Sequence, residues 1–365
     1  MTVLGLMSGT SFDGLDLCVV RFNRTQEGYR YEIKHSFHCA YPEKFVSQLK
    51  RAHLASETEM LALEESFDAI TISAIKELFE RYDEKIDLIS SHGHTTLHQP
   101  ERGITRQIGN GKLLSETFKI PVVYDFRSSD VALGGQGAPL VPIGDHLLFH
   151  DYDICLNLGG ISNLSYSFES KRHAFDVGMF NTPINELVEP LGYYYDKDGG
   201  IAASGSLIKS LFERLNTLEF YAIQGAKSLG KEWYYSYYVK EVEAVKASPE
   251  DLVRTVTEHN VYQITRAIRE IYNHQKATEK LKVLVTGGGA HNRFAMQLLQ
   301  SQTQSFASMI IPDPQLVDYK EALVFAFMGY LRVHNEINVY SSVTGASSDS
   351  CAGTLIQPNE QRTFS

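Results

Sequence analysis

The sequence has 365 residues, a length that favours two domains, because single hydrophobic cores rarely grow beyond about 250–300 residues. Hydrophobic residues make up 43% and charged residues 21%, which is ordinary globular usage and excludes a disordered or fibrous chain. The formal net charge of −10 argues against nucleic acid and anionic membranes as partners, because the chain has no surplus of Lys and Arg to neutralise phosphates.

The cysteines and the first residues bear on the compartment. The sequence has four cysteines, far apart and without a CxxC pair, and we expect them to be free thiols in a reducing environment. Residues 1–5 lead straight into a strand-like segment without the basic and apolar regions of a secretory signal. No run of 18 apolar residues is present, so the sequence favours a cytoplasmic protein.

The first part of the chain is predicted to begin with two strands joined by a glycine turn. Alternating apolar residues predict the strands, and apolar residues at helical spacing predict the helices. The predicted strands are 2–7, 15–22, 31–41, 86–91 and 120–124, and the predicted helices are 42–53 and 57–82. A polar, glycine-rich stretch at 126–139 then marks a lobe boundary. The predicted N-terminal lobe is therefore 1–130, with 337–365 as a candidate completion, and the C-terminal lobe is 131–336.

The second part of the chain repeats this opening. Two strands are predicted around the Gly159-Gly160 turn, and a third strand follows them. This weak repeat predicts two duplicated lobes that each begin with a β-meander. Helices and strands alternate afterwards, which predicts an α/β class with mixed sheets. The later ranges are strands at 154–158, 161–167, 173–176 and 282–285, and helices at 248–277, from 291 or 292, and at 319–336.

The first glycine turn, within residues 5–16, has the composition of an anion-binding loop. Its small residues let backbone N–H groups approach an anion, and its hydroxyl groups add donors. Asp13 and Asp16 suit Mg²⁺ on a phosphate better than bare phosphate. No Gly-Lys-Ser/Thr follows, so the segment is not a P-loop. A structural hairpin is an equally good interpretation of the spacing alone.

The second glycine-rich turn, residues 286–292, follows a buried strand and opens a helix. That arrangement suits a nucleotide phosphate at a helix N-terminus, but the segment is not the GxGxxG fingerprint. A plain strand-to-helix turn is the alternative. Because one glycine turn falls in each predicted lobe, we expect a nucleotide in a cleft between the lobes.

Three further groups of side chains have two interpretations each. Asp176, at a strand end beside glycine, could act as a general base or cap the next helix. The histidines of residues 92–98 could form a zinc hydrolase site or a chance cluster. Arg127 and Asp130 could bind a polar ligand or form a structural ion pair. Tyrosines at 193–195 and 234–238 could stack on a sugar, although packing between helices is the favoured interpretation.

Taken together, the motifs identify a family. Nearly end to end, the chain resembles anhydro-N-acetylmuramic acid kinases, which belong to the superfamily of sugar kinases, actin and chaperone ATPases. The resemblance rests on GLMSGTSxDGxD at 5–16, SHGHT at 91–95, QIGN at 107–110, DFRxxD at 125–130, GGQGAPLVP at 134–142, LNLGGISN at 156–163, KSLGKE at 227–232, GGGAHN at 287–292, EALVFA at 321–326 and TGA at 344–346.

The resemblance implies a two-lobed actin-like ATPase fold, in which each lobe has a mixed sheet of the five-stranded type flanked by helices. It also implies an ATP- and Mg²⁺-dependent hydrolytic kinase that acts as a homodimer. The reaction opens the 1,6-anhydro bridge of anhydro-N-acetylmuramic acid with water and phosphorylates O6, in peptidoglycan recycling. Asp176 falls on the family's catalytic aspartate, and Asp13 is the candidate for the Mg²⁺ that ATP carries.

The remaining site residues follow from the same resemblance. On the nucleotide side it implies Gly9, Thr10, Ser11, Asp13, Gly14, Asp16, Gly159, Gly160, Gly287, Gly288, Gly289 and Asn292. On the sugar side it implies His92, His94, Thr95, Arg127, Asp130, Gln136, Asn181 and Glu321.

Departures from the family pattern cluster after the catalytic aspartate. The family's Gly-Pro-Gly-Asn is here residues 178–181, with Met179 and Phe180 in place of small residues, and the usual glutamine of the SHG motif is His94. We expect these changes to alter the sugar pocket or the angle of the γ-phosphate. Two alternatives therefore stay open: a kinase for another anhydro or amino sugar, and a catalytically weakened, nucleotide-dependent sugar-binding protein.

Overall fold

The computed structural model describes residues 1–9, 11–223, 225 and 227–358, so the predicted phosphate-loop residue Thr10 lies outside the described residues. The chain forms two compact units. Unit 1 comprises Met1–Leu148 and Tyr319–Ser365, and unit 2 comprises Phe149–Asp318. None of the helices in the described part of the chain is long and apolar enough to cross a membrane.

Unit 1 is built on a mixed six-stranded sheet with the order β13-β7-β4-β1-β2-β3. β1, β2 and β3 form an antiparallel meander, β1, β4 and β7 run parallel, and β13 is antiparallel to β7. Beside the sheet lies the β5–β6 hairpin. The strands are β1 (Thr2–Ser8), β2 (Gly14–Thr25), β3 (Gly28–Ala40), β4 (Leu88–Ser91), β5 (His94–Gln99), β6 (Ile104–Ile108), β7 (Val122–Tyr124) and β13 (Thr354–Ile356).

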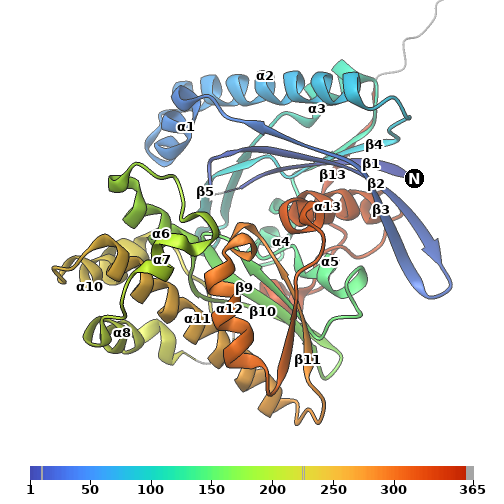
Figure 1. Ribbon diagram of the computed structural model, residues 1–365. Helices are drawn as coiled ribbons and strands as arrows, with labels where there is room; N and C mark the ends of the chain where they lie inside the picture. The colour runs from blue at the N-terminus through green and yellow to red at the C-terminus, as the bar shows by residue number, and fades with distance from the viewer. Residues whose placement is uncertain (10, 224, 226, 359–365) are drawn as a thin grey trace, which may run out of the picture. The chain divides into compact units, whose positions relative to one another are not determined.

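Two long helices cover the sheet of unit 1 (Figure 1). α2 begins with a complete capping box between Ser56 and Glu59, and its apolar face packs on Leu4 and Leu6. α13 packs against Gly5, whose missing side chain leaves room for the backbone of Ala322. Because neighbouring residues of β1 face opposite sides, α2 and α13 lie on opposite faces of the sheet. The helices are α1 (Glu43–Lys50), α2 (Glu57–Arg81), α3 (Gly111–Phe118), α4 (Ser128–Ala132), α5 (Pro142–Leu147), α13 (Pro314–Val333) and α14 (Ser341–Thr344).

Unit 2 has a mixed five-stranded sheet with the order β10-β9-β8-β11-β12. β8, β9 and β10 form an antiparallel meander, and β8, β11 and β12 run parallel. α11 and α12 supply the apolar residues that bury the sheet, among them Ile264, Ile268 and Leu299. The strands are β8 (Ile154–Leu158), β9 (Ile161–Phe168), β10 (Lys171–Met179), β11 (Leu281–Thr286) and β12 (Ala307–Ile310).

The helices of unit 2 include one π-helical turn within the tyrosine-rich segment, at Tyr234–Tyr238. They are α6 (Asn181–Val188), α7 (Gly200–Ser204), α8 (Lys209–Asn216), α9 (Lys231–Trp233), α10 (Val239–Glu243), α11 (Pro249–His274) and α12 (Arg293–Thr303). Single 3-10 turns connect several of these helices.

The two sheets confirm the predicted mixed α/β class and the predicted repeat. Five strands in each unit follow one order, a meander and then two parallel strands, and β13 makes the first sheet one strand wider than expected. The predicted lobe boundaries, 130/131 and 336/337, differ from the division after Leu148 and Asp318. The difference has a physical basis, because a buried ion pair joins Asp145 of α5 to Lys320 of α13 within unit 1.

Candidate active site

In unit 1 one predicted carboxylate, Asp13, lies in the β1–β2 connection, and a second, Asp16, lies near the start of β2. Ser11 Oγ donates to Asp13 Oδ1 at 2.5 Å, and Asp16 pairs with His38 Nδ1 at 2.7 Å. The hydrogen bond to Asp16 is the main reason that the pKa of His38 is raised. Gly14 is sterically required, since a Cβ there would lie 2.4 Å from the Cys39 carbonyl oxygen. Gly9 has only Ser11 within 4 Å of such a Cβ.

The donor set of this turn fits a magnesium ion that arrives on a nucleotide phosphate. Asp13 is exposed and Asp16 is partly buried, so hard oxygen ligands are available at the surface of the turn. The described residues contain no cluster of three side chains able to hold a metal by themselves. A cation here would therefore take its remaining ligands from phosphate and water, as Mg²⁺ commonly does.

The first histidine of the SHGHT motif is tied to the predicted sugar-side arginine. Arg127 donates through Nε and Nη2 to His92 Nε2, at 3.1 and 2.9 Å, and also donates to the Gly137 carbonyl. Burial lowers the pKa of Arg127 to about 10, opposed by Glu321 and Asp130. Burial also lowers the pKa of His92 well below its usual value, and the guanidinium adds to this effect. The pair is therefore a neutral imidazole beside a buried cation.

Three other predicted sugar-side residues hold the surrounding loops together. The Asp130 carboxylate is fully buried and accepts from the Gly137 amide and from Thr344 Oγ1, each at 2.7 Å. The backbone amide of Gln136 donates to the Thr344 carbonyl oxygen. Thr95 accepts a long hydrogen bond, 3.5 Å, from the side chain of Gln107.

The remaining two predicted sugar-side residues of unit 1 lie in buried polar surroundings. His94 Nδ1 hydrogen-bonds Ser8 Oγ at 2.9 Å, and Ser8 in turn accepts from the hydroxyl of Tyr41 at 2.6 Å. The ring of Phe12 lies 5.5 Å from the ring of His94. Burial raises the pKa of Glu321, while Lys320 opposes the shift.

The histidine segment does not gather its nitrogens around one point. His92 pairs with Arg127, His94 with Ser8, and His98 Nδ1 with Thr105 Oγ1. Separate partners of this kind do not make the converging three-histidine set that a zinc hydrolase needs.

In unit 2 the predicted glycine turns meet around Asn181. The turn Gly159-Gly160 accepts backbone hydrogen bonds from Phe180, Asn181 and Thr182, at 2.9, 3.1 and 3.3 Å. The Asn181 side chain donates to the Leu158 carbonyl oxygen and lies 3.8 Å from the position of a Cβ on Gly288. The structure thus brings Gly159, Gly160, Asn181 and Gly288 together at one end of the sheet.

The two residues that depart from the family pattern are core residues. Met179 and Phe180 are 2% and 1% exposed, so neither side chain lines an open pocket. Phe180 packs against the second glycine turn, where a Cβ on Gly289 would lie 2.4 Å from the Phe180 ring. A Cβ on Gly287, which has a φ of +84°, would lie 2.5 Å from Asn157 Oδ1. Phe180 therefore acts on the backbone of the second glycine turn, whereas Met179 packs in an apolar cluster with Ile184 and Val188. The expectation that these two side chains reshape a pocket finds no support in their burial.

Asn292, predicted on the nucleotide side, is the N-cap of α12. Its Oδ1 accepts the Ala295 amide at 2.9 Å, which satisfies one of the free N–H groups of the first helical turn. The side chain is 7% exposed and fits against Gly199, where any Cβ would collide with it. Its position fixes the start of the helix that follows the glycine turn.

Asp176 lies in β10, the edge strand of the sheet, at a β-bulge. The register between β9 and β10 shifts between Asp176 and Gly178, so Val177 is the extra residue. Asp176 Oδ2 accepts the backbone amide of Leu229 at 2.7 Å. Burial raises the pKa of Asp176 to about 6, and the Leu229 amide opposes the rise. A carboxylate with this pKa is mostly ionised at pH 7 and can still accept a proton there. The capping interpretation is not needed, since α6 begins at Asn181.

Sequence reasoning missed several partners of these residues. His38 and Tyr41 lie on or next to β3, and Leu229 lies in a loop far along the chain. The KSLGKE segment was a visible signal for Leu229, because it was part of the resemblance without an assigned role.

The tyrosines match the predicted packing interpretation only in part. Tyr234 and Tyr238 are buried, but Tyr194 is 90% exposed.

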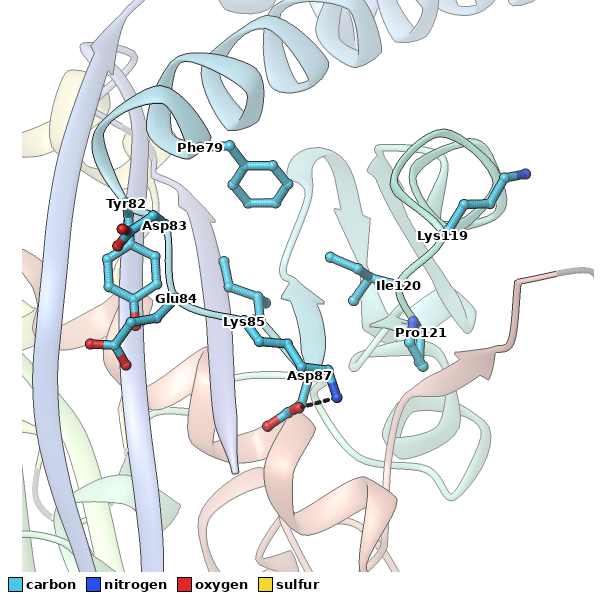
Figure 2. Close-up of a pocket in the computed structure, with 10 residues that line it drawn as sticks. Phe79, Tyr82, Asp83, Glu84, Lys85, Asp87, Lys119, Ile120 and Pro121 are labelled. Atoms are coloured by element: carbon cyan, nitrogen blue, oxygen red, sulfur yellow. Dashed lines mark ion pairs between the residues drawn. The ribbon is translucent and has the colours of Figure 1, made fainter.

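A pocket lined by residues of unit 1 lies away from the predicted site residues. It has a volume of about 660 Å³ and borders the amino ends of β4 and β7 (Figure 2). Asp87 in this pocket already pairs with Lys85 and with the Thr2 amide, and Glu84 pairs with Arg21. The predicted site residues instead follow the carboxyl ends of these strands, where parallel sheets generally bind ligands.

These observations define a class of two-unit α/β proteins. In each unit a glycine-containing turn joins the first two strands of the sheet, and in unit 2 an acid lies at a strand bulge. The family model described as "Anhydro-N-acetylmuramic acid kinase" matches residues 1–358. The chain belongs to the anhydro-N-acetylmuramic acid kinase family.

Individual relatives agree with this family over their whole length. The chain is 33% identical to the anhydro-N-acetylmuramic acid kinase of Aliivibrio fischeri, over 98% of this chain and 99% of that protein. It is 32% identical to the protein of that description from Pseudomonas savastanoi pv. phaseolicola, over 96% and 98%. Among solved structures, component A of the (R)-2-hydroxyglutaryl-CoA dehydratase of Acidaminococcus fermentans is similar at 11% identity, over 92% of this chain and 99% of that chain. The TM-score of this similarity is 0.47.

Proposed function

We propose that this chain converts 1,6-anhydro-N-acetylmuramic acid, ATP and water to N-acetylmuramic acid 6-phosphate and ADP, as a step of peptidoglycan recycling. The observation that carries the proposal is Asp176. Its carboxylate lies at a strand bulge, one oxygen is held by the Leu229 amide, and burial brings its pKa to about 6. These are the properties expected of a general base that works near neutral pH.

Asp176 accepts a proton from the attacking water. The water oxygen forms a bond to the anomeric carbon, the bond from that carbon to the bridging oxygen breaks, and the proton passes to the carboxylate. The released O6 bonds to the γ-phosphorus of ATP, and the bond from that phosphorus to the bridging oxygen of ADP breaks. One water and one phosphoryl group are therefore added to the sugar.

The glycine turns of unit 2 are our candidates for the nucleotide. Gly159, Gly160 and Gly287–Gly289 carry no side chains of their own, and Gly160 and Gly288 are exposed, so backbone N–H groups of these turns are candidates for contacts to phosphate oxygens. In unit 1, Ser11 and the neighbouring glycines are candidates for contacts to phosphate. Asp13 and Asp16 would hold a phosphate-bound Mg²⁺, which supplies charge neutralisation during phosphoryl transfer.

The polar groups of unit 1 are our candidates for the sugar. His92, held by Arg127, offers a neutral imidazole, and His94 is oriented by Ser8. Asp130 and Gln136 support these residues by fixing the loop between Arg127 and Gly137. We further propose, on the family resemblance alone, that the protein is a homodimer, which sedimentation analysis would test.

The decisive experiment measures ADP release with ATP and Mg²⁺, with and without the anhydro sugar, followed by mass spectrometry of the sugar. We expect release that depends on the sugar, and a product heavier by one phosphoryl group and one water. Release that depends instead on another anhydro or amino sugar would identify the related kinase. Sugar binding without release of ADP would favour the catalytically weakened binding protein.

The role of Asp176 has its own test. Asp176→Asn removes the proton acceptor, and we expect turnover to fall at least about a hundredfold while nucleotide binding persists. The matched control is Asp151→Asn, an equal charge change on an exposed residue of unit 2. Residual turnover within about tenfold of the parent would contradict the assignment of the base.

A further inference from the structure

A short loop clasps Asp176 at the edge of its sheet. β10 is an edge strand, so the backbone amide of Asp176 has no partner strand on its outer side. The Lys227 carbonyl oxygen accepts this amide at 2.9 Å, and two residues later the Leu229 amide donates to Asp176 Oδ2 at 2.7 Å. The loop therefore holds both the backbone and one carboxylate oxygen of the same residue.

Lys227 anchors this loop to the preceding segment. Its ammonium group donates to the carbonyl oxygens of Phe220 and Ile223, each at 3.2 Å, and lies 4.5 Å from the centre of the Phe220 ring. The side chain is partly buried, and burial lowers the pKa of Lys227, with Arg266 adding to the effect and Glu270 opposing it. A lysine used in this way replaces water around two carbonyl groups and fixes the start of the loop.

We propose that Lys227 is a positioning residue that, through the Leu229 amide, determines which oxygen of Asp176 accepts the proton. Oδ2 is occupied by the amide, and the described residues provide no hydrogen bond to Oδ1. Oδ1 is thus the oxygen that takes the proton from water. This inference rests on the proposed function of Asp176 as the general base.

Loss of the Lys227 ammonium group should change the pKa of Asp176 in a predictable direction. The Leu229 amide stabilises the ionised carboxylate, so its displacement raises the proton affinity of Asp176. Within the described residues, burial and the Leu229 amide are the contributions to the pKa of Asp176 and no charged side chain is among them. Arg266 and Glu270 of α11 act on Lys227. Lys227→Met should therefore move the acid limb of kcat/KM for the sugar upward by about one pH unit, which is a tenfold change in proton affinity. KM for ATP should stay unchanged.

The experiment compares pH profiles of four proteins: the parent, Lys227→Met, Lys227→Arg and Lys246→Met. Lys246 is an exposed lysine of unit 2, and its substitution makes the same change in charge and side chain. We expect the shift in Lys227→Met, its partial reversal in Lys227→Arg and the parent profile in Lys246→Met. A parent profile in Lys227→Met, or an equal shift in Lys246→Met, would overturn the proposal.

A second pair of variants tests the amide directly and also covers a Lys227→Met protein that does not fold. Leu229→Pro removes the N–H group, whereas Leu229→Ala keeps it and shortens the side chain. The shift should appear in the proline variant alone, and equal profiles would overturn the inference. Asp176→Asn distinguishes failure of the proposed function from failure of this inference. Substantial activity in that variant would refute the role of Asp176 as the general base. An inactive Asp176→Asn with unshifted loop variants refutes only the role of Lys227.

Discussion

The two units share one strand order, but they differ at the end of the first hairpin. In unit 1, β1 ends at Ser8 and β2 begins at Gly14, and the connection carries an exposed carboxylate. In unit 2, β8 and β9 are joined by Gly159 and Gly160 alone. The longer turn offers side-chain ligands, whereas the shorter turn offers peptide groups. One topology therefore supplies two different kinds of phosphate contact in the proposed function.

The strand registers show which residues occupy equivalent positions in the two units. One residue pair before the end of each first hairpin, Asp16 faces His38 in unit 1 and Asn163 faces Asp176 in unit 2. His38 turns to its cross-strand neighbour Asp16, whereas Asp176 is bonded from outside the sheet by Leu229. The same place in a duplicated sheet thus holds a hydrogen-bonded Asp–His pair in one unit and, in the other, a buried acid held by a backbone amide. A base is more readily obtained from the second arrangement, because no neighbouring charge lowers its pKa.

The residue after the third strand is aromatic in both units, and its removal should have the largest effect on stability. Phe180 is 1% exposed and packs on Gly289, so Phe180→Ala should lower the free energy of unfolding by about 3–5 kcal/mol. In unit 1, Tyr41→Phe removes only the hydroxyl that bonds Ser8, and should cost about 0.5–1.5 kcal/mol. Urea unfolding of both variants measures this. Equal losses would contradict the expected difference between removing a buried ring and removing a single hydroxyl.

The two glycine turns should respond differently to a methyl group. Gly289→Ala drives a Cβ into the Phe180 ring and should cost about 1–3 kcal/mol of stability. Gly9→Ala meets only Ser11 Oγ, at 3.6 Å, and should leave stability within about 0.5 kcal/mol of the parent. Thermal unfolding checks both values. If Gly9→Ala keeps its stability but loses affinity for ATP, unit 1 contributes to nucleotide binding. A marked loss of stability in Gly9→Ala would contradict the open surroundings of Gly9.

The smallest effect concerns the stability cost of the base. Because the folded-state pKa of Asp176 is raised to about 6, its ionisation destabilises the fold as the pH rises through that value. Asp176→Asn avoids this cost and should be more stable than the parent at pH 8 by on the order of 1–2 kcal/mol. The advantage should vanish below about pH 4, where the parent carboxyl is protonated in both states. Urea unfolding at pH 4 and pH 8 measures the difference, and an unchanged difference would mean that Asp176 is not buried in solution.

The sequence allowed the repeat and the mixed sheets to be predicted because alternation and glycine turns are local signals. It placed Asp176 at the end of a strand, whereas β10 continues to Met179 and Asp176 lies at a bulge within it. The bulge at Val177 could not be predicted, since it is a register shift between β9 and β10 that no residue pattern marks. The contact from Leu229 to Asp176 could not be predicted either, since these residues are 53 positions apart in the chain. Side-chain volume alone suggested that Phe180 would reach a pocket, but burial of apolar surface favours the core. The addition of β13 to the sheet of unit 1 could not be predicted either, because its pairing with β7 is long-range and leaves no local pattern in the sequence.

That last strand has a consequence for synthesis on the ribosome. Unit 2 is one continuous segment, so it can fold as soon as residue 318 has emerged. Unit 1 has to wait for α13 and β13, which come from the end of the chain and cover Gly5 and the edge of β7. Until then its sheet has an exposed face and an open edge, both of which favour aggregation. Nascent chains are therefore most vulnerable in the half that was translated first.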